Sequence, residues 1–428
     1  MTDAAADARL RQPENGAPGP ASGSQAERGA ELRAALVDQL RTEGKITSAL
    51  VKAAFLTVRR EHFLPEETPL ETAYGFDSSV VTKRDEGGGA LSSVSAAYIQ
   101  ARMLEQAGLS PGMSVLEIGS GGLNAALIAE IVGEQGHVVT VDIDPEVTDR
   151  ATKLLDEAGY GSRVRVVAAD AENGVPGRAE FNAIIVTVGA WDIAPAWLRQ
   201  LAQNGTLVLP LVMNGVTRTV GLRRDGEHLT STSIEVAGFV PMQGIGRHDE
   251  RLFVLAGPDG KKITLRFDDG APVTPAELDD VLASGPVENW SGVVFPPATS
   301  WADLYLWLAW YLPGFCRLVA EDSSALEKHG TWFPFGVVSG AGFAFFVTRT
   351  APNGKGVEFG ATAYGRDGEL AAATLVEQIR AWDRDGRPVA GPSIGYWPTG
   401  SDLSKIPSDA AVMEKTHGVV TISWPPKG

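Results

Sequence analysis

The sequence predicts an α/β protein, with a doubly wound, Rossmann-like domain followed by a C-terminal α+β domain. Three observations lead to this prediction. Short apolar runs alternate with helical patterns between residues 96 and 211, which is typical of a parallel sheet with helices on both faces. One apolar run leads directly into a glycine-rich turn and a further helix. After Gly257 the composition changes, and eight of the ten tryptophans lie beyond that residue.

The length of 428 residues suggests two or three domains. Residues 1–28 carry almost no apolar side chain larger than alanine, so we expect a disordered N-terminal tail there. The main domain then covers residues 29–257, and the C-terminal α+β domain covers residues 258–428.

Two helices are expected to open the main domain. From Ala30 onward, Leu32, Leu36 and Leu40 recur at helical spacing, and residues 49–58 read as a second helix. A loop-rich section follows over residues 65–89 and ends in three glycines. We expect this section to form a lid or an exposed loop.

The alternating region gives the elements of the parallel sheet. The run over 183–188 is almost continuously apolar, as in a strand buried on both faces. Asp144 followed by Pro145 is a typical helix start. The strands are expected at 115–118, 138–141, 164–168, 183–188 and 206–211, and the helices at 96–107, 123–132, 144–158 and 195–201. Two further strands, 216–222 and 251–256, are expected at one end of this sheet.

The C-terminal domain is expected to mix both element types. Its helices are predicted at 299–312 and 370–382, and its strands at 343–350, 357–364 and 419–424, with a hairpin turn at 352–354. Four tryptophans of this domain either bind a peptide or pack in the core: Trp290, Trp301, Trp307 and Trp310. Helical spacing at 301–312 favours the core.

Composition excludes several classes of protein. With 37 basic and 53 acidic residues the net charge is −16, which argues against nucleic-acid or anionic-membrane partners. No apolar run reaches the length of a membrane span, and no secretory signal opens the chain, so we expect a cytoplasmic protein. The single cysteine, Cys316, reads as a buried hydrophobe. The six histidines are scattered, so no metal site is predicted.

The segment over 115–122 carries the chemistry. A strand runs into Gly119-Ser120-Gly121-Gly122 and then a helix, a turn that brings a ligand close to a helix N-terminus. Asp142 ends the next strand, where a carboxylate can accept hydrogen bonds from two ribose hydroxyls. Asp170 ends the third strand, where it can meet an adenine amino group.

Two ligands fit this pattern: a nicotinamide dinucleotide and S-adenosylmethionine. The dinucleotide fingerprint requires a third glycine, and that position holds Asn124. Glu117, before the turn, is typical of methyltransferases. We therefore favour S-adenosylmethionine and a class I methyltransferase domain.

Five ordered segments resemble the protein L-isoaspartate O-methyltransferases. They are residues 58–65 (VRREHFLP), 94–98 (VSAAY), 115–121 (VLEIGSG), 181–187 (FNAIIVT) and 195–210. The resemblance covers about residues 46–255. It implies that Ser95 is the active-site serine, and that the cofactor-binding residues are Glu117, Gly119, Ser120, Gly121, Gly122, Asp142 and Asp170.

The chain departs from the family pattern at residues 188–192 (VGAWD), which replace an alanine- and proline-rich turn. Together with residues 92–95 and 238–244, this loop is similar to homologues associated with bacterial lanthipeptides and graspetides. That resemblance implies methylation of an aspartate side chain in a ribosomally made, already cyclised precursor peptide. The ester would close to aspartimide and could then hydrolyse to isoaspartate.

Three functions are therefore weighed. The favoured one is a methyltransferase dedicated to such a peptide, with the C-terminal domain binding the substrate. The alternative is a repair methyltransferase for isoaspartyl proteins. The third is a non-catalytic peptide-binding partner of a cyclase, and the presence of Ser95, Asp142 and Asp170 argues against it. The oligomeric state is not predicted.

Overall fold

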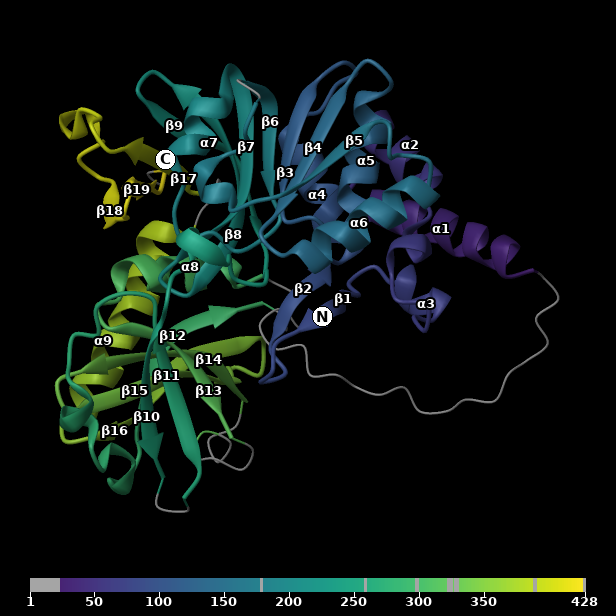
Figure 1. The fold of residues 1–428 in the computed structure, drawn as a ribbon. Helices are drawn as coiled ribbons and strands as arrows, with labels where there is room; N and C mark the ends of the chain where they lie inside the picture. Colours follow the sequence, from purple (N-terminus) through teal and green to yellow (C-terminus); the bar gives the residue numbers. More distant parts are fainter. Residues whose placement is uncertain are drawn as a thin grey trace.

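Two large sheets with their covering helices make up the computed structural model (Figure 1). The structure describes residues 24–177, 180–257, 260–296, 300–321, 326, 331–387 and 391–425. Within that part of the chain, one sheet has ten strands and the other has seven.

The centre of the larger sheet is parallel. Its strands are β3 (Ser114–Ile118), β4 (His137–Asp142), β5 (Val164–Ala168), β6 (Phe181–Val186) and β7 (Leu201–Met213). They lie in the order β5-β4-β3-β6-β7. The connection therefore reverses direction at β3, which is the doubly wound arrangement. The predicted fold class is confirmed.

Helices cover both faces of this sheet. Val115, Val138 and Ile185 face the helices α1, α2, α4, α5 and α6, whereas Leu116, Val139 and Ile184 face α7. This alternation follows from the period of two along each strand. The helices are α1 (Gln25–Thr42), α2 (Ala49–Thr57), α4 (Ala97–Ala107), α5 (Leu123–Val132), α6 (Pro145–Glu157) and α7 (Pro195–Gln200).

Helix α1 corrects part of the predicted N-terminal tail. The tail was expected over residues 1–28, and residues 1–23 lie outside the described part of the chain. Residues 25–28 are helical, because Ser24 and Glu27 form a capping box in which each side chain meets the other residue's backbone N–H.

The loop predicted over residues 65–89 is partly ordered as a helix and a hairpin. It contains α3 (Leu70–Ala73), and β1 (Val80–Arg84) pairs antiparallel with β2 (Ala90–Val94). The three glycines lie at the tip of this hairpin. Lys83 ties the hairpin to the start of α6, since its Nζ lies 2.5 Å from Asp144 Oδ2 and 2.7 Å from Glu146 Oε2.

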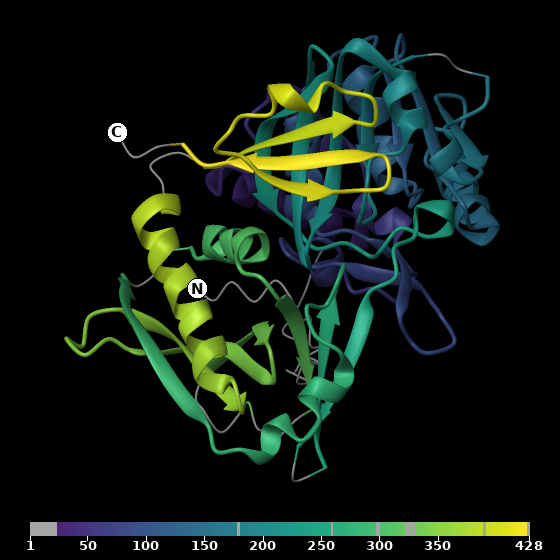
Figure 2. The ribbon, with the colours of Figure 1, turned by 90° about the vertical axis from the view of Figure 1, so that its left-hand side faces the viewer.

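Antiparallel strands extend the larger sheet beyond β7. They are β8 (Val216–Asp225), β9 (His228–Val236), β17 (Ser393–Pro398), β19 (Gly418–Ser423) and β18 (Ala411–Glu414), in that order. The last three, β17, β19 and β18, come from the end of the chain and join the larger sheet through the pairing of β17 with β9 (Figure 2). The prediction that residues 258–428 form one separate domain is thus wrong for residues 393–423, because β17 pairs with β9 and returns the chain to the larger sheet.

The smaller sheet is antiparallel, in the order β10-β11-β13-β14-β15-β16-β12. Residues 251–256 were expected in the first sheet, but they form β10 and pair with β11 here. The predicted hairpin around residues 352–354 is confirmed by the pairing of β15 with β16. The strands are β10 (Arg251–Ala256), β11 (Lys262–Phe267), β12 (Val287–Phe295), β13 (Phe315–Ala320), β14 (Thr331–Ser339), β15 (Gly342–Thr350) and β16 (Val357–Gly365), with helices α8 (Ala302–Tyr311) and α9 (Gly368–Ala381).

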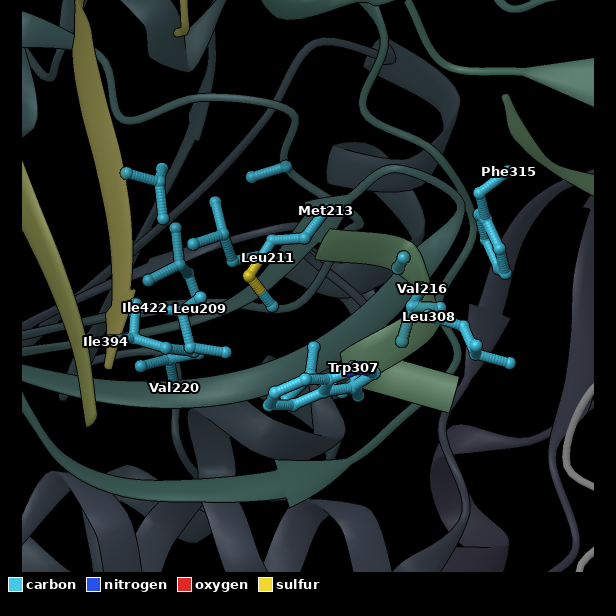
Figure 3. Close-up of a cluster of buried hydrophobic side chains, with 14 of the residues drawn as sticks. Leu209, Leu211, Met213, Val216, Val220, Trp307, Leu308, Phe315, Ile394 and Ile422 are labelled. Carbon is cyan, nitrogen blue, oxygen red and sulfur yellow. The ribbon is translucent and has the colours of Figure 1, made fainter. Parts of the chain in front are cut away.

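One hydrophobic core joins the two sheets through α8 (Figure 3). Trp307 and Leu308 of α8 belong to the same cluster as Leu211, Val220 and Ile394 of the larger sheet. The prediction that the 301–312 helix carries core residues is therefore confirmed. Cys316 is buried as predicted, at 1% exposure. No helix in the described ranges is long and apolar enough to cross a membrane.

Candidate functional site

A cleft of about 590 Å³, open to solvent, lies at the carboxyl ends of β3, β4 and β6. This is the point where the strand order reverses, and where open α/β sheets bind ligands. Six predicted site residues line the cleft: Ser95, Glu117, Gly119, Ser120, Gly121 and Asp142. The N-terminal hairpin contributes a further wall through residues 91–94 of β2.

The glycine turn is shaped to leave room at the floor of the cleft. Gly119 has a φ of +99°, and a Cβ there would approach Thr187 Oγ1 to 2.5 Å. Gly121 borders the open space, since a Cβ there would meet no atom within 4 Å. Gly122, at φ +84°, precedes α5, and a Cβ there would approach the Phe63 ring to 3.2 Å. Gly122 itself does not line the cleft.

Asp142 bridges the glycine turn and the loop after β4. Its Oδ2 accepts the Ser120 N–H at 3.0 Å, and its Oδ1 accepts the Asp144 N–H at 3.0 Å. Burial raises the pKa of Asp142 above its ordinary value. Each carboxylate oxygen has a second lone pair, which leaves Asp142 able to accept further hydrogen bonds from a ligand.

Glu117 is almost fully buried beneath the turn, at 1% exposure. The Thr140 hydroxyl donates to its Oε2 at 2.6 Å. Burial raises the pKa of Glu117 to about 7. The carboxyl therefore holds its proton far more strongly in the folded protein than in the unfolded chain.

Glu117→Gln is expected to stabilise the ligand-free protein at pH 8 but hardly at pH 5. Between the ordinary pKa of 4.5 and about 7, the unfolded chain loses this proton while the folded protein keeps it, so wild-type stability falls as pH rises. Glutamine removes that loss, which amounts to at most about 3 kcal/mol. Denaturant unfolding at the two pH values measures the difference.

Glu105→Gln serves as a control of opposite sign. Burial raises the pKa of Glu105, but hydrogen bonds from Ser48 and Thr47 outweigh it and hold the pKa below its ordinary value. This variant is expected to lose stability at pH 8, because the ionised form is the one that the folded state favours. Equal stability of Glu117→Gln and wild type at pH 8 would contradict the interpretation of Glu117.

Ser95 lies at the cleft with its hydroxyl uncommitted to helix capping. Helix α4 begins at Ala97 with Ala96 as its N-cap, and no side chain caps it. Within the described residues, no hydrogen bond of the Ser95 hydroxyl is found. The Ser95 carbonyl accepts from Arg60 at 2.6 Å, so the backbone that carries the hydroxyl is fixed.

Arg60 is a buried residue in contact with Ser95, and sequence reasoning gave it no role. It is buried at 4% exposure and also donates to Gln100 Oε1 at 2.5 Å. Burial lowers the pKa of Arg60 to about 10. Arg60 lies in the segment 58–65, which resembles a motif of the family, but the sequence analysis assigned no role to any residue of that segment. Thr187, Val188, Phe239 and Val240, which also line the cleft, were likewise given no role.

Asp170 is placed outside the lining of the cleft. Its Oδ1 accepts the Glu172 N–H at 3.0 Å, and its Oδ2 accepts the Ile245 N–H at 2.8 Å. It follows β5 by two residues and caps the short turn at Ala171–Asn173. The predicted contact with an adenine stays a prediction, while the contact with Ile245 shows that Asp170 anchors the segment after β9.

The cleft fits S-adenosylmethionine. In the described part of the chain, the Ser120 hydroxyl is buried without a hydrogen-bond partner, and it lines this cleft. Gly121 leaves space where a side chain would project. Asp142 and Glu117 place two carboxyl groups at the cleft, and carboxyl oxygens accept hydrogen bonds of the kind that ribose hydroxyls donate. The free hydroxyl, the open space and the two carboxyl groups suit S-adenosylmethionine, which carries ribose hydroxyls and a positive charge.

Comparison with known proteins identifies one family. Residues 31–246 match the family model described as Protein-L-isoaspartate(D-aspartate) O-methyltransferase (PCMT). The chain is 36% identical over 232 residues to a protein-L-isoaspartate O-methyltransferase of Hyperthermus butylicus, covering 50% of this chain and 89% of that protein. It is 38% identical over 228 residues to the one of Staphylothermus marinus, covering 50% and 94%.

A solved structure of a protein-L-isoaspartate O-methyltransferase is also similar. It has 22% sequence identity and a TM-score of 0.47, covering 68% of this chain and 97% of that one. The family match ends at residue 246, so β10 and everything after it lie outside the matched region.

Proposed function

The chain belongs to the protein-L-isoaspartate O-methyltransferase family and is an S-adenosylmethionine-dependent methyltransferase, and from that premise we propose that it methylates a carboxylate of a peptide or protein. The substrate supported best is an isoaspartyl carboxylate, because the matched relatives are named for it. The observation that carries the proposal is that Ser95 and Asp142 line one cleft.

Each residue of the cleft has a role in this proposal. Asp142, Glu117 and the turn over residues 119–121 would hold S-adenosylmethionine, which supplies an electrophilic methyl group when bound. The Ser95 hydroxyl would donate a hydrogen bond to one oxygen of the acceptor carboxylate and so orient the other. A hydroxyl does this without adding charge. A carboxylate is already ionised at neutral pH, so no general base is required.

The apolar walls of the cleft would displace water from a bound acceptor. Val94, Val188 and Phe239 line it beside Ser95. Removing the hydration shell of a carboxylate strengthens the hydrogen bonds that it accepts from the protein. Arg60 contributes by holding the Ser95 carbonyl, which keeps the hydroxyl at the cleft.

A second substrate is an aspartate side chain of a ribosomally made, macrocyclic precursor peptide. The feature that favours it is the C-terminal unit, whose smaller sheet lies outside the family match. We propose that this unit, within residues 258–428, binds the peptide while residues 29–257 carry the methyl transfer. The backbone N–H that follows the ester would then attack its carbonyl, and methanol would leave with that proton, giving aspartimide.

Intact-mass measurement on matched peptides tests both substrates. The full-length protein and S-adenosylmethionine are incubated with a linear isoaspartyl peptide, the same peptide with aspartate, and a macrocyclic aspartyl peptide. Methyl gain on the isoaspartyl peptide alone supports the repair substrate. Gain on the macrocycle, followed by loss of methanol, supports the peptide-tailoring substrate. No gain on any of the three would overturn methylation of a peptide carboxylate.

A further inference from the structure

The loop over residues 188–194, which follows β6, forms one wall of the cleft through Val188. Gly189 donates to the Val240 carbonyl at 2.7 Å, and the Met242 N–H donates to Gly189 at 3.0 Å. Phe239 and Val240 line the cleft as well. Backbone hydrogen bonds therefore join the two segments of this wall, and the strand order places it on the other side of β3 from Asp142.

Asp192 ties this wall to the end of the chain. Its Oδ1 accepts the Tyr396 hydroxyl at 2.9 Å, and its Oδ2 accepts the His417 N–H at 2.6 Å. Tyr396 is fully buried in β17. Asp192 is half-buried, and hydrogen bonds to a charged carboxylate are among the stronger ones in proteins. The C-terminal segment thus fixes the loop over residues 188–194 through two hydrogen bonds to the Asp192 carboxylate.

Trp191 is held from both faces of its ring. The His248 ring stacks on it at a centroid distance of 3.7 Å and an interplanar angle of 7°. Lys415 Nζ lies 3.0 Å from the ring centroid, too close for both groups to share one face. Lys415 also donates to the Val212 carbonyl at 2.9 Å. Cation–π and stacking contacts of this kind fix an aromatic ring in position.

The anchored residues fall where the chain departs from the family pattern, at 188–192. Their partners Tyr396, Lys415 and His417 lie outside the family match over 31–246. We propose that Asp192 is a positioning residue for the acceptor substrate, held in place by Tyr396 and the His417 backbone. The proposal rests on the proposed transfer to a carboxylate. It assigns to β17–β19 the task of shaping the acceptor wall.

Tyr396→Phe is the test variant, and Thr421→Val is its matched control. Thr421 accepts a hydrogen bond from Trp397 at 3.3 Å in the same pair of strands, away from the loop. Three quantities are measured for both full-length variants and wild type: hydrogen–deuterium exchange of residues 187–194, the Kd for S-adenosylmethionine, and kcat and KM for the acceptor peptide.

For Tyr396→Phe we expect faster exchange in the loop and an acceptor KM about tenfold higher, with the Kd for S-adenosylmethionine unchanged. Thr421→Val is expected to behave as wild type. Unchanged exchange, or an unchanged KM, overturns the proposal. The same changes in Thr421→Val overturn it too, because they would show a general loosening of the sheet.

The exchange measurement separates this proposal from the proposed function. If wild type methylates none of the acceptors, the proposed function fails. Faster exchange in Tyr396→Phe alone would then still support the anchoring of the loop, and unchanged exchange would still overturn it.

Discussion

Ser95→Ala is expected to lower kcat for carboxylate methylation by about 100-fold, with the Kd for S-adenosylmethionine staying within about twofold of wild type. Ser95 lines the cleft, caps no helix and is fixed through its carbonyl by Arg60. Alanine removes the one hydroxyl hydrogen bond that would orient the acceptor carboxylate. The backbone contact of Arg60 remains, so the fold should be kept.

Single-turnover kinetics with the acceptor peptide, together with cofactor titration, measure this effect. Ser110→Ala is a suitable control, since Ser110 is exposed in the turn before β3. Turnover of Ser95→Ala at the wild-type rate would show that Ser95 is not an active-site residue. Loss of cofactor binding in the same variant would place Ser95 in the cofactor site.

Asp142→Ala is expected to weaken S-adenosylmethionine binding by about 100-fold, since two hydrogen bonds to a charged group are lost. The carboxylate also fixes the glycine turn through the Ser120 N–H. Isothermal titration of the ligand-free protein gives the Kd directly, without any acceptor. The measurement therefore tests the cofactor site independently of the substrate.

Asp144→Ala is the matched control for Asp142→Ala. Asp144 lies two residues away, caps α6 by accepting the Glu146 N–H at 3.0 Å, and pairs with Lys83. Its loss should cost about 1 kcal/mol of stability as a lost helix cap, with little change in the Kd. Equal weakening in both variants would indicate that Asp142 acts through net charge and not through contact with the ligand.

Much of the parallel sheet could be predicted because its signals are local. The apolar run over 183–188 indicated β6, a strand that is buried on both faces. Asp144 and Pro145 indicated the start of α6, with Asp144 as its N-cap and Pro145 as its first residue. Glycine at position 119 is required by a φ of +99° and by the nearness of Thr187. Each of these features depends on neighbours within a few residues, or on burial alone.

The antiparallel parts were predicted less well. The hairpin β1/β2 and the strands β9, β11, β12, β13, β14, β17 and β18 were missed, and β10 was assigned to the wrong sheet. An antiparallel strand pairs with its neighbours through backbone groups that every residue carries. The sequence pattern therefore indicates a strand without indicating its partner.

The sequence by itself determined the doubly wound core, the glycine turn and the position of Asp142 at the end of the neighbouring strand, because periodicity and turn chemistry are properties of short segments. Only the tertiary structure decided that β17–β19 complete the first sheet and that Asp192 meets Tyr396 and the His417 backbone, 204 and 225 residues further along the chain. Such contacts arise when distant segments bury their apolar faces together. No local pattern records which of the possible pairings forms.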